Sequence, residues 1–520
     1  MRRQREGEGR GEQAESRVTP RTSVAVVSYN HREALQRLLA FLDEKKVPTF
    51  VTDNASSDGT REAVRDRYRG VTLLESPGNL GGTGGFNCAL LAALSTGSEY
   101  VLLVDDDALP VGDCLERLER FLDERPEYVF AAPAIYIAGK GDTLQETGGG
   151  IDFSRPMPVE AWNRFALQPD LPPHLDVGYA SACCLMVRAE AVRQVGVMDW
   201  NFFIFSDDVD WTLRLQRASG RRGACVTGAR AEHEFPWAKP FSPMRLYYFN
   251  RNGLYLVSRF ADGEGRGRAL RWALRRPLRR LAYAALIGDR EVAATLWRAM
   301  RDAWTRTYGR WRDPVAFPAR RRQLDADFVR RHGVRRVLVD ITIEDVDLEM
   351  LAALRAIGGN GLQVDVLCDR HRVGVYRDRG IFREVRGRTA GLLGPLGDWW
   401  RVYRSGYDLV VTDAGMEPRR PTSMAGRRAA FFHAGALYEA RAVPLLAPVA
   451  YAAGAALGLA GSAALFWRFR VRPELGTPSE EAAAVLASIG YDGRVGQPWA
   501  RLGALARAAS PPPGGEASVP

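Results

Sequence analysis

Three consecutive aspartates, Asp105, Asp106 and Asp107, follow directly after the apolar run 101–104. Neighbouring anions repel one another, so packing alone gives no reason for such a cluster. Carboxylate oxygens are the ligands that Mg²⁺ and Mn²⁺ prefer, and proteins often share these ions between carboxylates and substrate phosphates. Because ligands bind at the carboxyl ends of strands in α/β sheets, the cluster indicates a metal and diphosphate site. The alternative is a solvated aspartate-rich turn.

The segments before these aspartates alternate between strand and helix patterns. Strands are expected over residues 23–30, 49–53 and 71–75, and Leu35, Leu38, Leu39 and Leu42 repeat at helical spacing. Residues 78–87 are rich in glycine, which permits close approach of the backbone to a ligand, and a helix is expected from Cys88 to Leu94. This order predicts a nucleotide-binding half that ends at the aspartates.

Four motifs up to Asp107 together resemble the inverting nucleotide-sugar glycosyltransferases of family 2, which have the GT-A fold. They are Ser28-Tyr-Asn30, Asp53-Asn-Ala-Ser-Ser-Asp-Gly-Thr60, Asn79-Leu-Gly-Gly-Thr-Gly-Gly-Phe86 and Asp105-Asp-Asp107. Downstream, segments 203–214, 232–237 and 247–252 are similar to acceptor-side motifs of bacterial galactofuranosyltransferases, and rhamnosyltransferases share much of this pattern. The resemblance covers about residues 21 to 258, and the joint occurrence of these loose motifs makes it specific.

The resemblance implies a role for each matching polar residue. Asp208 would be the general base that accepts the proton of the acceptor hydroxyl, and Asp207 would hydrogen-bond the acceptor. Mn²⁺ or Mg²⁺ would be held by Asp105, Asp107 and His233. The residues implied to bind the nucleotide-sugar donor are Tyr29, Asn30, Asp53, Asn79, Gly84, Asp105 and Asp106.

Structural roles stay open for some of the same residues. Asp207 and Asp208 precede an apparent helix, and acidic side chains favour the amino-terminal end of a helix. His233 is otherwise an ordinary loop histidine, and Asp210 is spaced to pair with Arg214. Polymerising galactofuranosyltransferases carry a tryptophan-rich acceptor platform, but residues 178–186 contain no tryptophan, which leaves the acceptor and the donor sugar open.

Much of the positive charge behind the net +10 follows this region. Residues 266–281 are rich in arginine, and their leucines can share one helix face around Pro277. This favours an anionic membrane surface over nucleic acid, because no nucleic-acid-binding module is recognised, and a solvated face packed on the catalytic core is the alternative. Residues 442–467 are uncharged and long enough to span a bilayer, or to form a buried or interfacial helix.

A second α/β pattern begins at Val337, with further strands expected at 364–367, 409–413 and 429–433. The predicted fold class is therefore α/β, with a GT-A domain followed by a basic helical segment and a smaller Rossmann-like α/β domain. The expected boundaries are a disordered tail at 1–20, the GT-A domain at 21–260, the basic helical segment at 261–333, the Rossmann-like domain at 334–440, an apolar helix at 441–470 and a C-terminal tail at 471–520.

These features predict a metal-dependent inverting glycosyltransferase on the cytoplasmic side of the cell membrane. Six cysteines without paired metal spacing fit reduced thiols, and the amino terminus lacks the apolar core of a secretory signal. The expected partners are UDP-galactofuranose, or dTDP-rhamnose as the second choice, a lipid-linked glycan acceptor and an anionic membrane surface. A catalytically silent glycan-assembly scaffold is the alternative from another class, and Asp413 with His433 leaves a second catalytic site open.

Overall fold

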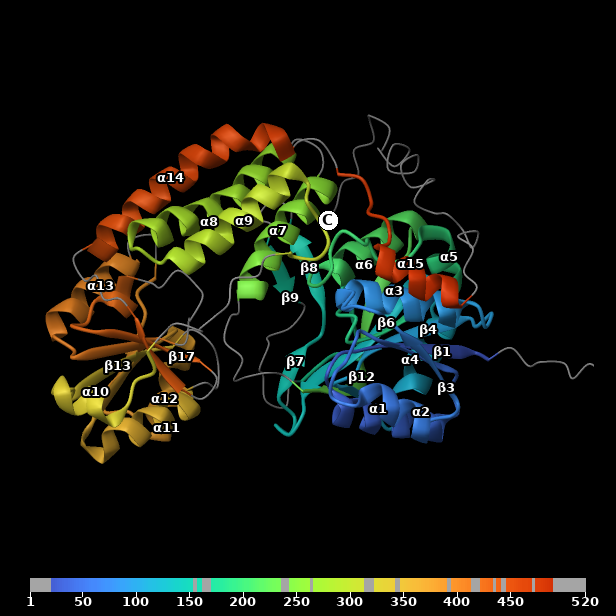
Figure 1. Ribbon diagram of the computed structural model, residues 1–520, viewed down its shortest axis with the longest axis horizontal. Helices are drawn as coiled ribbons and strands as arrows, with labels where there is room; N and C mark the ends of the chain where they lie inside the picture. Colours follow the sequence, from blue (N-terminus) through green and yellow to red (C-terminus); the bar gives the residue numbers. More distant parts are fainter. Residues whose placement is uncertain are drawn as a thin grey trace, which may run out of the picture.

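The computed structural model describes residues 20–152, 157–160, 170–234, 243–261, 265–312, 322–341, 347–390, 394–412, 421–433, 436–440, 446–469 and 473–489. Figure 1 shows a large sheet flanked by helices, a group of long helices, and a smaller sheet beyond those helices. Except for Pro20, the tail expected at 1–20 lies outside the described residues, as does Asp413.

The large sheet has the strand order β10-β12-β6-β11-β4-β1-β2-β3, with β5 paired to β12 and β7 to β6. The strands β4, β1, β2 and β3 are parallel, as expected for apolar strands joined by helices. The strands are β1 (Thr22–Ser28), β2 (Thr49–Asp53), β3 (Val71–Glu75), β4 (Tyr100–Asp105), β5 (Ala108–Val111), β6 (Tyr128–Ile137), β7 (Leu144–Glu146), β10 (His174–Val177), β11 (Cys184–Arg188) and β12 (Arg222–His233). The strands predicted before the aspartates are thereby confirmed.

Helices cover both faces of this sheet, and each face has its own apolar core. The helices are α1 (Arg32–Lys45), α2 (Thr60–Arg67), α3 (Gly81–Leu94), α4 (Cys114–Glu124), α5 (Ala189–Val195) and α6 (Asp207–Ser219). A separate hairpin is formed by β8 (Gly149–Asp152) and β9 (Met157–Glu160). All six cysteines are buried, and none of them forms a disulfide.

The glycine-rich segment is helical, contrary to the prediction that the helix begins at Cys88. The helix α3 starts at Gly81, which has φ of +73°. A Cβ on Gly81 would lie 2.0 Å from the carbonyl oxygen of Phe203, and one on Gly85 would lie 2.3 Å from Val27 Cγ2. The glycines therefore let α3 pack closely against β1 and against the segment that precedes α6.

Long helices lie between the two sheets, namely α7 (Pro243–Phe260), α8 (Arg266–Leu286), α9 (Arg290–Thr305) and α14 (Leu446–Phe469). Leu270 and Leu274 of α8 are buried, which confirms the predicted apolar face of this basic helix. α14 runs along α8, where a Cβ on Gly458 would lie 2.8 Å from Arg279 Cβ. Small residues thus allow α14 to pack against the backbone of α8.

The smaller sheet has the order β15-β14-β13-β16-β17-β18, in which β18 alone is antiparallel to its neighbour. The four predicted strands are present, and β15 and β18 are additional. The strands are β13 (Arg336–Asp340), β14 (Gln363–Cys368), β15 (Val385–Gly387), β16 (Leu409–Thr412), β17 (Ala429–His433) and β18 (Ala436–Ala440). The accompanying helices are α10 (Ala326–Arg331), α11 (Asp347–Gly358), α12 (Val373–Arg379) and α13 (Gly394–Ser405), with short 3-10 turns η1 (Gly359–Gly361), η2 (Arg370–Arg372) and η3 (Pro421–Met424).

Part of the expected C-terminal tail packs on the first sheet instead. Ser479 caps α15 (Glu480–Ser488) by accepting a hydrogen bond from the backbone N–H of Ala482. Ala482, Val485 and Leu486 are buried in the core that contains α3. The prediction of a tail over 471–520 missed this short amphipathic pattern, and residues 490–520 lie outside the described part of the chain.

Candidate active site

The three aspartates lie where β4 ends, at the carboxyl edge of the large sheet. Asp105 is the last residue of β4 and is in register with Val27 of β1. The next strand, β5, pairs with β12 so that Ala108 lies opposite His233. This pairing brings His233 Nε2 to 3.1 Å from Asp107 Oδ1, although the two residues are 126 positions apart.

The side chains at this edge fit a divalent cation. Ligand atoms of Asp105, Asp107 and His233 lie within 4.8 Å of one another, and so do those of a second group, His31, Asp106 and Asp107. Carboxylate oxygens with an imidazole nitrogen suit Mn²⁺ and accommodate Mg²⁺. His233 Nδ1 lies 3.0 Å from Gln145 Oε1 and 2.9 Å from its Nε2. When Nδ1–H donates to Oε1, the other ring nitrogen is left unprotonated and able to bind a metal, as is common for ligating histidines.

Burial and charge act against each other in this cluster. Burial raises the pKa of Asp105 well above its usual range, and the negative charge of Asp107 raises it further. Burial also raises the pKa of Asp106, although His31 opposes it. For Asp107, burial disfavours the carboxylate, but the hydrogen bond and charge of His233 outweigh it and lower the pKa. A bound cation would favour the ionised form of all three carboxylates.

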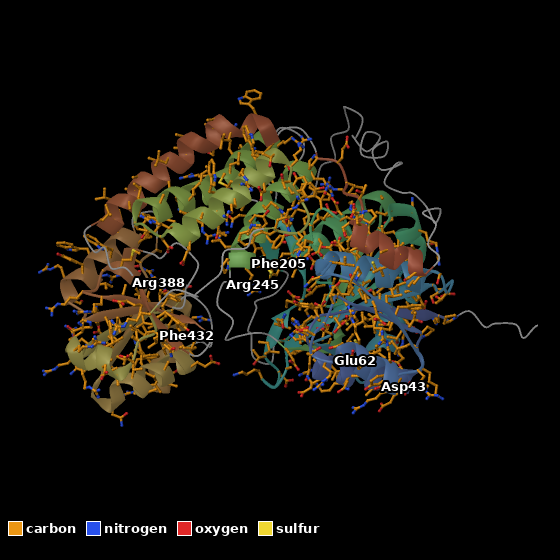
Figure 2. The ribbon with its side chains drawn as sticks, viewed as in Figure 1. Asp43, Glu62, Phe205, Arg245, Arg388 and Phe432 are labelled. Carbon is orange, nitrogen blue, oxygen red and sulfur yellow. The ribbon has the colours of Figure 1, made fainter. Side chains whose placement is uncertain are left out.

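The chain enters α6 through a strained segment. Phe203, Phe205 and Ser206 have φ values of 76°, 64° and 66°, which are uncommon for residues other than glycine. Asn252 of α7 holds this segment, because its Nδ2 donates to the carbonyls of Ile204 and Phe205 at 2.8 Å each. Figure 2 shows Phe205 beside Arg245 of α7, whose guanidinium carbon lies 5.6 Å from the centre of the phenyl ring. Such strain persists only where the surroundings enforce it, and it is typical of functional sites.

The first turn of α6 presents two carboxylates, the buried Asp207 and the half-buried Asp208. Asp207 Oδ2 accepts a hydrogen bond from the hydroxyl of Thr83 at 2.6 Å, and Asp208 Oδ1 accepts one from the N–H of Val209 at 2.7 Å. Burial, together with the negative charge of Asp207, raises the pKa of Asp208 to about 8. A carboxylate that titrates near neutral pH has the property that a general base requires.

Asp210, one position further into the same turn, has a structural role. Its Oδ2 accepts a hydrogen bond from Arg214 Nε at 2.7 Å, and its Oδ1 pairs with Arg259. All three side chains are nearly buried. The predicted pairing of Asp210 with Arg214 is confirmed, and this aspartate is already neutralised by two cations.

Three predicted donor-binding residues lie around the same edge. The side chain of Tyr29 is 46% exposed, and its backbone N–H donates to Asp106 Oδ2 at 3.0 Å. Asn30 Oδ1 accepts a hydrogen bond from the N–H of Ser57 at 2.7 Å. The structure therefore brings Tyr29, Asn30 and Asp106 together beside Asp105.

Asp53, Asn79 and Gly84 are placed in supporting positions. Asp53 is fully buried, and its Oδ2 pairs with Arg61. Asn79 Oδ1 accepts a hydrogen bond from the N–H of Gly81 at the start of α3. A Cβ on Gly84 would lie 2.7 Å from the Cβ of Leu80, so the glycine permits close packing there. Direct donor contacts from these three residues stay a prediction.

Residues 23–196 match the family model described as glycosyl transferase family 2. The chain carries a family 2 glycosyltransferase domain. The N-acetylglucosaminyl-diphospho-decaprenol L-rhamnosyltransferase of Mycobacterium tuberculosis is 28% identical over 274 residues, which are 48% of this chain and 88% of that protein. Galactofuranosyltransferase GlfT1 of Mycolicibacterium smegmatis is 28% identical over 210 residues, which are 39% of this chain and 68% of that protein.

Two solved structures were also found to be similar. GalNAc-T7 with UDP, GalNAc and Mn²⁺ has a TM-score of 0.38 at 14% identity, and the match covers 50% of this chain and 51% of that one. S. aureus TarS 1–349 in complex with UDP has a TM-score of 0.34 at 15% identity, and the match covers 57% of this chain and 94% of that one. The family match, the curated relatives and the mixed sheet confirm the predicted glycosyltransferase with a GT-A-like α/β fold.

Three residues that contact the candidate site, His31, Gln145 and Thr83, were not predicted from the sequence. His31 directly follows the Ser28-Tyr-Asn30 motif, and its Nδ1 lies 3.0 Å from Asp106 Oδ1. The position of His31 directly after this motif is the sequence feature that could have identified it. Gln145 reaches the site through the pairing of β7 with β6, and Thr83 reaches it through the packing of α3. Neither the pairing nor the packing can be predicted from a local sequence pattern.

The rate of sugar transfer should rise with pH towards about 8, because Asp208 must lose its proton to act as a base. Asp207→Asn removes the adjacent negative charge that raises the pKa of Asp208. The rising part of the curve of transfer rate against pH, its rising limb, should therefore move to lower pH. Initial rates at saturating donor between about pH 6 and pH 9 measure this limb. An unmoved limb, or one at higher pH, contradicts the role of Asp207 charge.

Proposed function

We propose that this glycosyltransferase transfers a hexose from a nucleotide-diphosphate donor to a hydroxyl of a lipid-linked glycan, with inversion at the anomeric carbon. The proposal rests on one observation, the convergence of the cluster of Asp105, Asp107 and His233 with the two carboxylates in the first turn of α6. The relative whose name specifies a decaprenol-linked acceptor supports a lipid-linked acceptor here.

The chemistry is a single displacement. Asp208 accepts the proton of the acceptor hydroxyl while the hydroxyl oxygen forms a bond to the anomeric carbon, and the bond between that carbon and the diphosphate oxygen breaks. The nucleotide diphosphate leaves with the electron pair. Asp105, Asp107 and His233 would hold a divalent cation, which supplies positive charge to the leaving diphosphate. Asn252 contributes by fixing the strained segment that aims the start of α6.

We infer that L-rhamnose is the donor sugar and that galactofuranose is second, which reverses the preference drawn from sequence motifs. The rhamnosyltransferase relative aligns over 88% of its length and the galactofuranosyltransferase over 68%, at the same identity. The absence of tryptophan in residues 178–186 also disfavours a galactofuranan-polymerising site.

Purified protein should therefore release nucleotide diphosphate fastest from dTDP-rhamnose when a polyprenyl-diphosphate-linked sugar acceptor is present. The measurement compares dTDP-rhamnose, UDP-galactofuranose and UDP-glucose at equal concentration, with and without acceptor. Faster turnover of UDP-galactofuranose would reverse the order of the two sugars. Acceptor-independent release from all three donors would contradict transfer to a lipid-linked glycan.

We propose that α14 attaches the protein to the cytoplasmic side of the membrane as an interfacial helix. In the described part of the chain, α14 is the one helix long and apolar enough to cross a membrane, and most of it is not buried. Its outer face exposes Val449, Leu457, Leu459 and Trp467 by 64%, 54%, 57% and 62%. Its inner face packs along α8, which carries seven arginines. A spanning α14 would draw these arginines into the hydrocarbon, at a cost of several kcal/mol.

Replacing both Leu457 and Leu459 by glutamate should weaken binding to vesicles with anionic lipid by roughly tenfold or more, because apolar side chains leave the interface. Co-sedimentation with vesicles measures the loss, and Val375→Glu, an exposed apolar residue on α12, is the matched control. Alkaline carbonate should extract the wild-type protein. Retention in the pellet would instead show a spanning helix, and vesicle binding unchanged by the double substitution would exclude α14 as the contact.

A further inference from the structure

The smaller sheet has a ligand-binding topology that the sugar-transfer site does not use. Numbered from β13, its strand order is 3-2-1-4-5-6, the order of doubly wound nucleotide-binding sheets. In such sheets, ligands bind beyond the carboxyl ends of the strands, near the point where the order reverses between the first and fourth strands. Here this point lies between β13 and β16, on the edge where Asp340 ends its strand.

A cavity of about 530 Å³ lies at this edge, between the smaller sheet and α8. The residues that follow β14 and β15 line it, as does the start of α13, whose helix N-terminus favours negative charge. Figure 2 shows Arg388 on the side of the smaller sheet that faces α8. We call this space the arginine cavity; its charged lining residues are Arg276, Arg279, Arg280, Arg370, Arg388, Asp369 and Asp398.

The acidic residues of the arginine cavity are already engaged by the protein. Asp398 accepts hydrogen bonds from the backbone N–H and the hydroxyl of Thr389 and pairs with Arg401. Asp369 Oδ1 accepts from Arg388 Nε at 3.0 Å, and Arg388 also donates to Asp340 at 2.6 Å. The two acids therefore hold the wall in place, and the positive charge of the lining exceeds the negative charge.

Arg279 and Arg370 reach the cavity from different parts of the chain, and Arg370 Nε donates to the carbonyl of Arg388 at 2.9 Å. Arg279 comes from α8 and lies 5.8 Å above the ring of Tyr451 in α14, whereas Arg370 follows β14 and is exposed. Both line the cavity. Guanidinium groups bind phosphate oxygens through paired hydrogen bonds, and the five arginines of the lining supply more positive charge than one phosphate group needs, which favours a diphosphate.

We propose that the arginine cavity binds a diphosphate group, separately from the catalytic site. Two sources share this chemistry, a nucleotide diphosphate and the headgroup of a polyprenyl-diphosphate lipid. A nucleotide would fit the strand order of the smaller sheet. A lipid headgroup would fit the position of the cavity beside α8 and α14, where Arg279 contacts the ring of Tyr451. The inference does not depend on which sugar the catalytic site transfers.

Titration calorimetry of the full-length protein with inorganic pyrophosphate, in buffer with chelator, tests the cavity alone. Chelation removes the metal that pyrophosphate would need at the catalytic site. The double substitution Arg279→Gln and Arg370→Gln should weaken binding by roughly tenfold or more, since two charge-assisted contacts are lost. Arg275→Gln, on the same helix but outside the lining, is the matched control, and Asp107→Ala should leave this binding unchanged.

Parallel titrations identify the source of the diphosphate. UDP binding more tightly than pyrophosphate would support a nucleotide site, and farnesyl diphosphate in mild detergent binding more tightly would support a lipid headgroup site. Sulfate binding as tightly as pyrophosphate would overturn the proposal, because the cavity would then be a general anion site. Pyrophosphate affinity that falls with Asp107→Ala, or equally with Arg275→Gln, would also overturn it.

Discussion

Asp208→Asn should leave donor binding intact and slow sugar transfer by at least roughly 10²-fold, the contribution of a positioned general base. Asparagine is nearly isosteric and its amide oxygen can still accept from the N–H of Val209, so the turn should be preserved. It cannot accept the acceptor proton. Single-turnover transfer rates and calorimetric donor affinity separate these two effects, because the base acts on the chemical step alone.

Thermal unfolding distinguishes this role from helix capping. The raised pKa of Asp208 means that the folded state disfavours its charged form, so the neutral amide should not lower the melting temperature. Asp210→Asn is the matched control in the same turn, and it should lower the melting temperature because it leaves Arg214 and Arg259 without their buried counter-ion. If Asp208→Asn lowers the melting temperature and keeps its turnover, Asp208 only caps the helix.

The strands of the transferase domain could be predicted because their patterns are local. Buried parallel strands appear as β-branched runs, and the aspartates stand at the end of one of them. The glycines of α3 misled the prediction, because glycine is a poor helix former and its use here depends on Phe203 and Val27 packing against it. Tertiary packing of this kind leaves no periodic signal.

The candidate site was predictable only as far as its motifs reached. Motif resemblance pointed to Asp105, Asp107 and His233, which the structure brings together through the pairing of β5 with β12. The partners that orient them, such as Gln145, come from strands whose pairing is set by the whole sheet. The arginine cavity is likewise invisible in sequence, because α8 and the smaller sheet are joined only in the folded chain.

Chelation should abolish transfer, and Mn²⁺ or Mg²⁺ should restore it, because the leaving diphosphate needs its charge neutralised. Asp107→Asn should reduce the transfer rate by at least roughly 10²-fold, since Asp107 belongs to both groups of ligand atoms. Binding also has a readout apart from activity. Mn²⁺ should raise the melting temperature of the wild-type protein, because a ligand bound only by the folded state stabilises it, and should not raise that of Asp107→Asn.

The two histidines decide which group of side chains holds the ion. His233→Ala removes a ligand of the group with Asp105 and Asp107, whereas His31→Ala removes one from the group with Asp106 and Asp107. We expect His233→Ala to lose the Mn²⁺-dependent rise in melting temperature and His31→Ala to keep it. The reason is that Gln145 contacts the other ring nitrogen of His233, and metal-ligating histidines usually have such a hydrogen-bond partner to fix the ring. The opposite pattern would move the ion to His31 and Asp106, and full activity of the wild type in excess chelator would remove the metal from the mechanism.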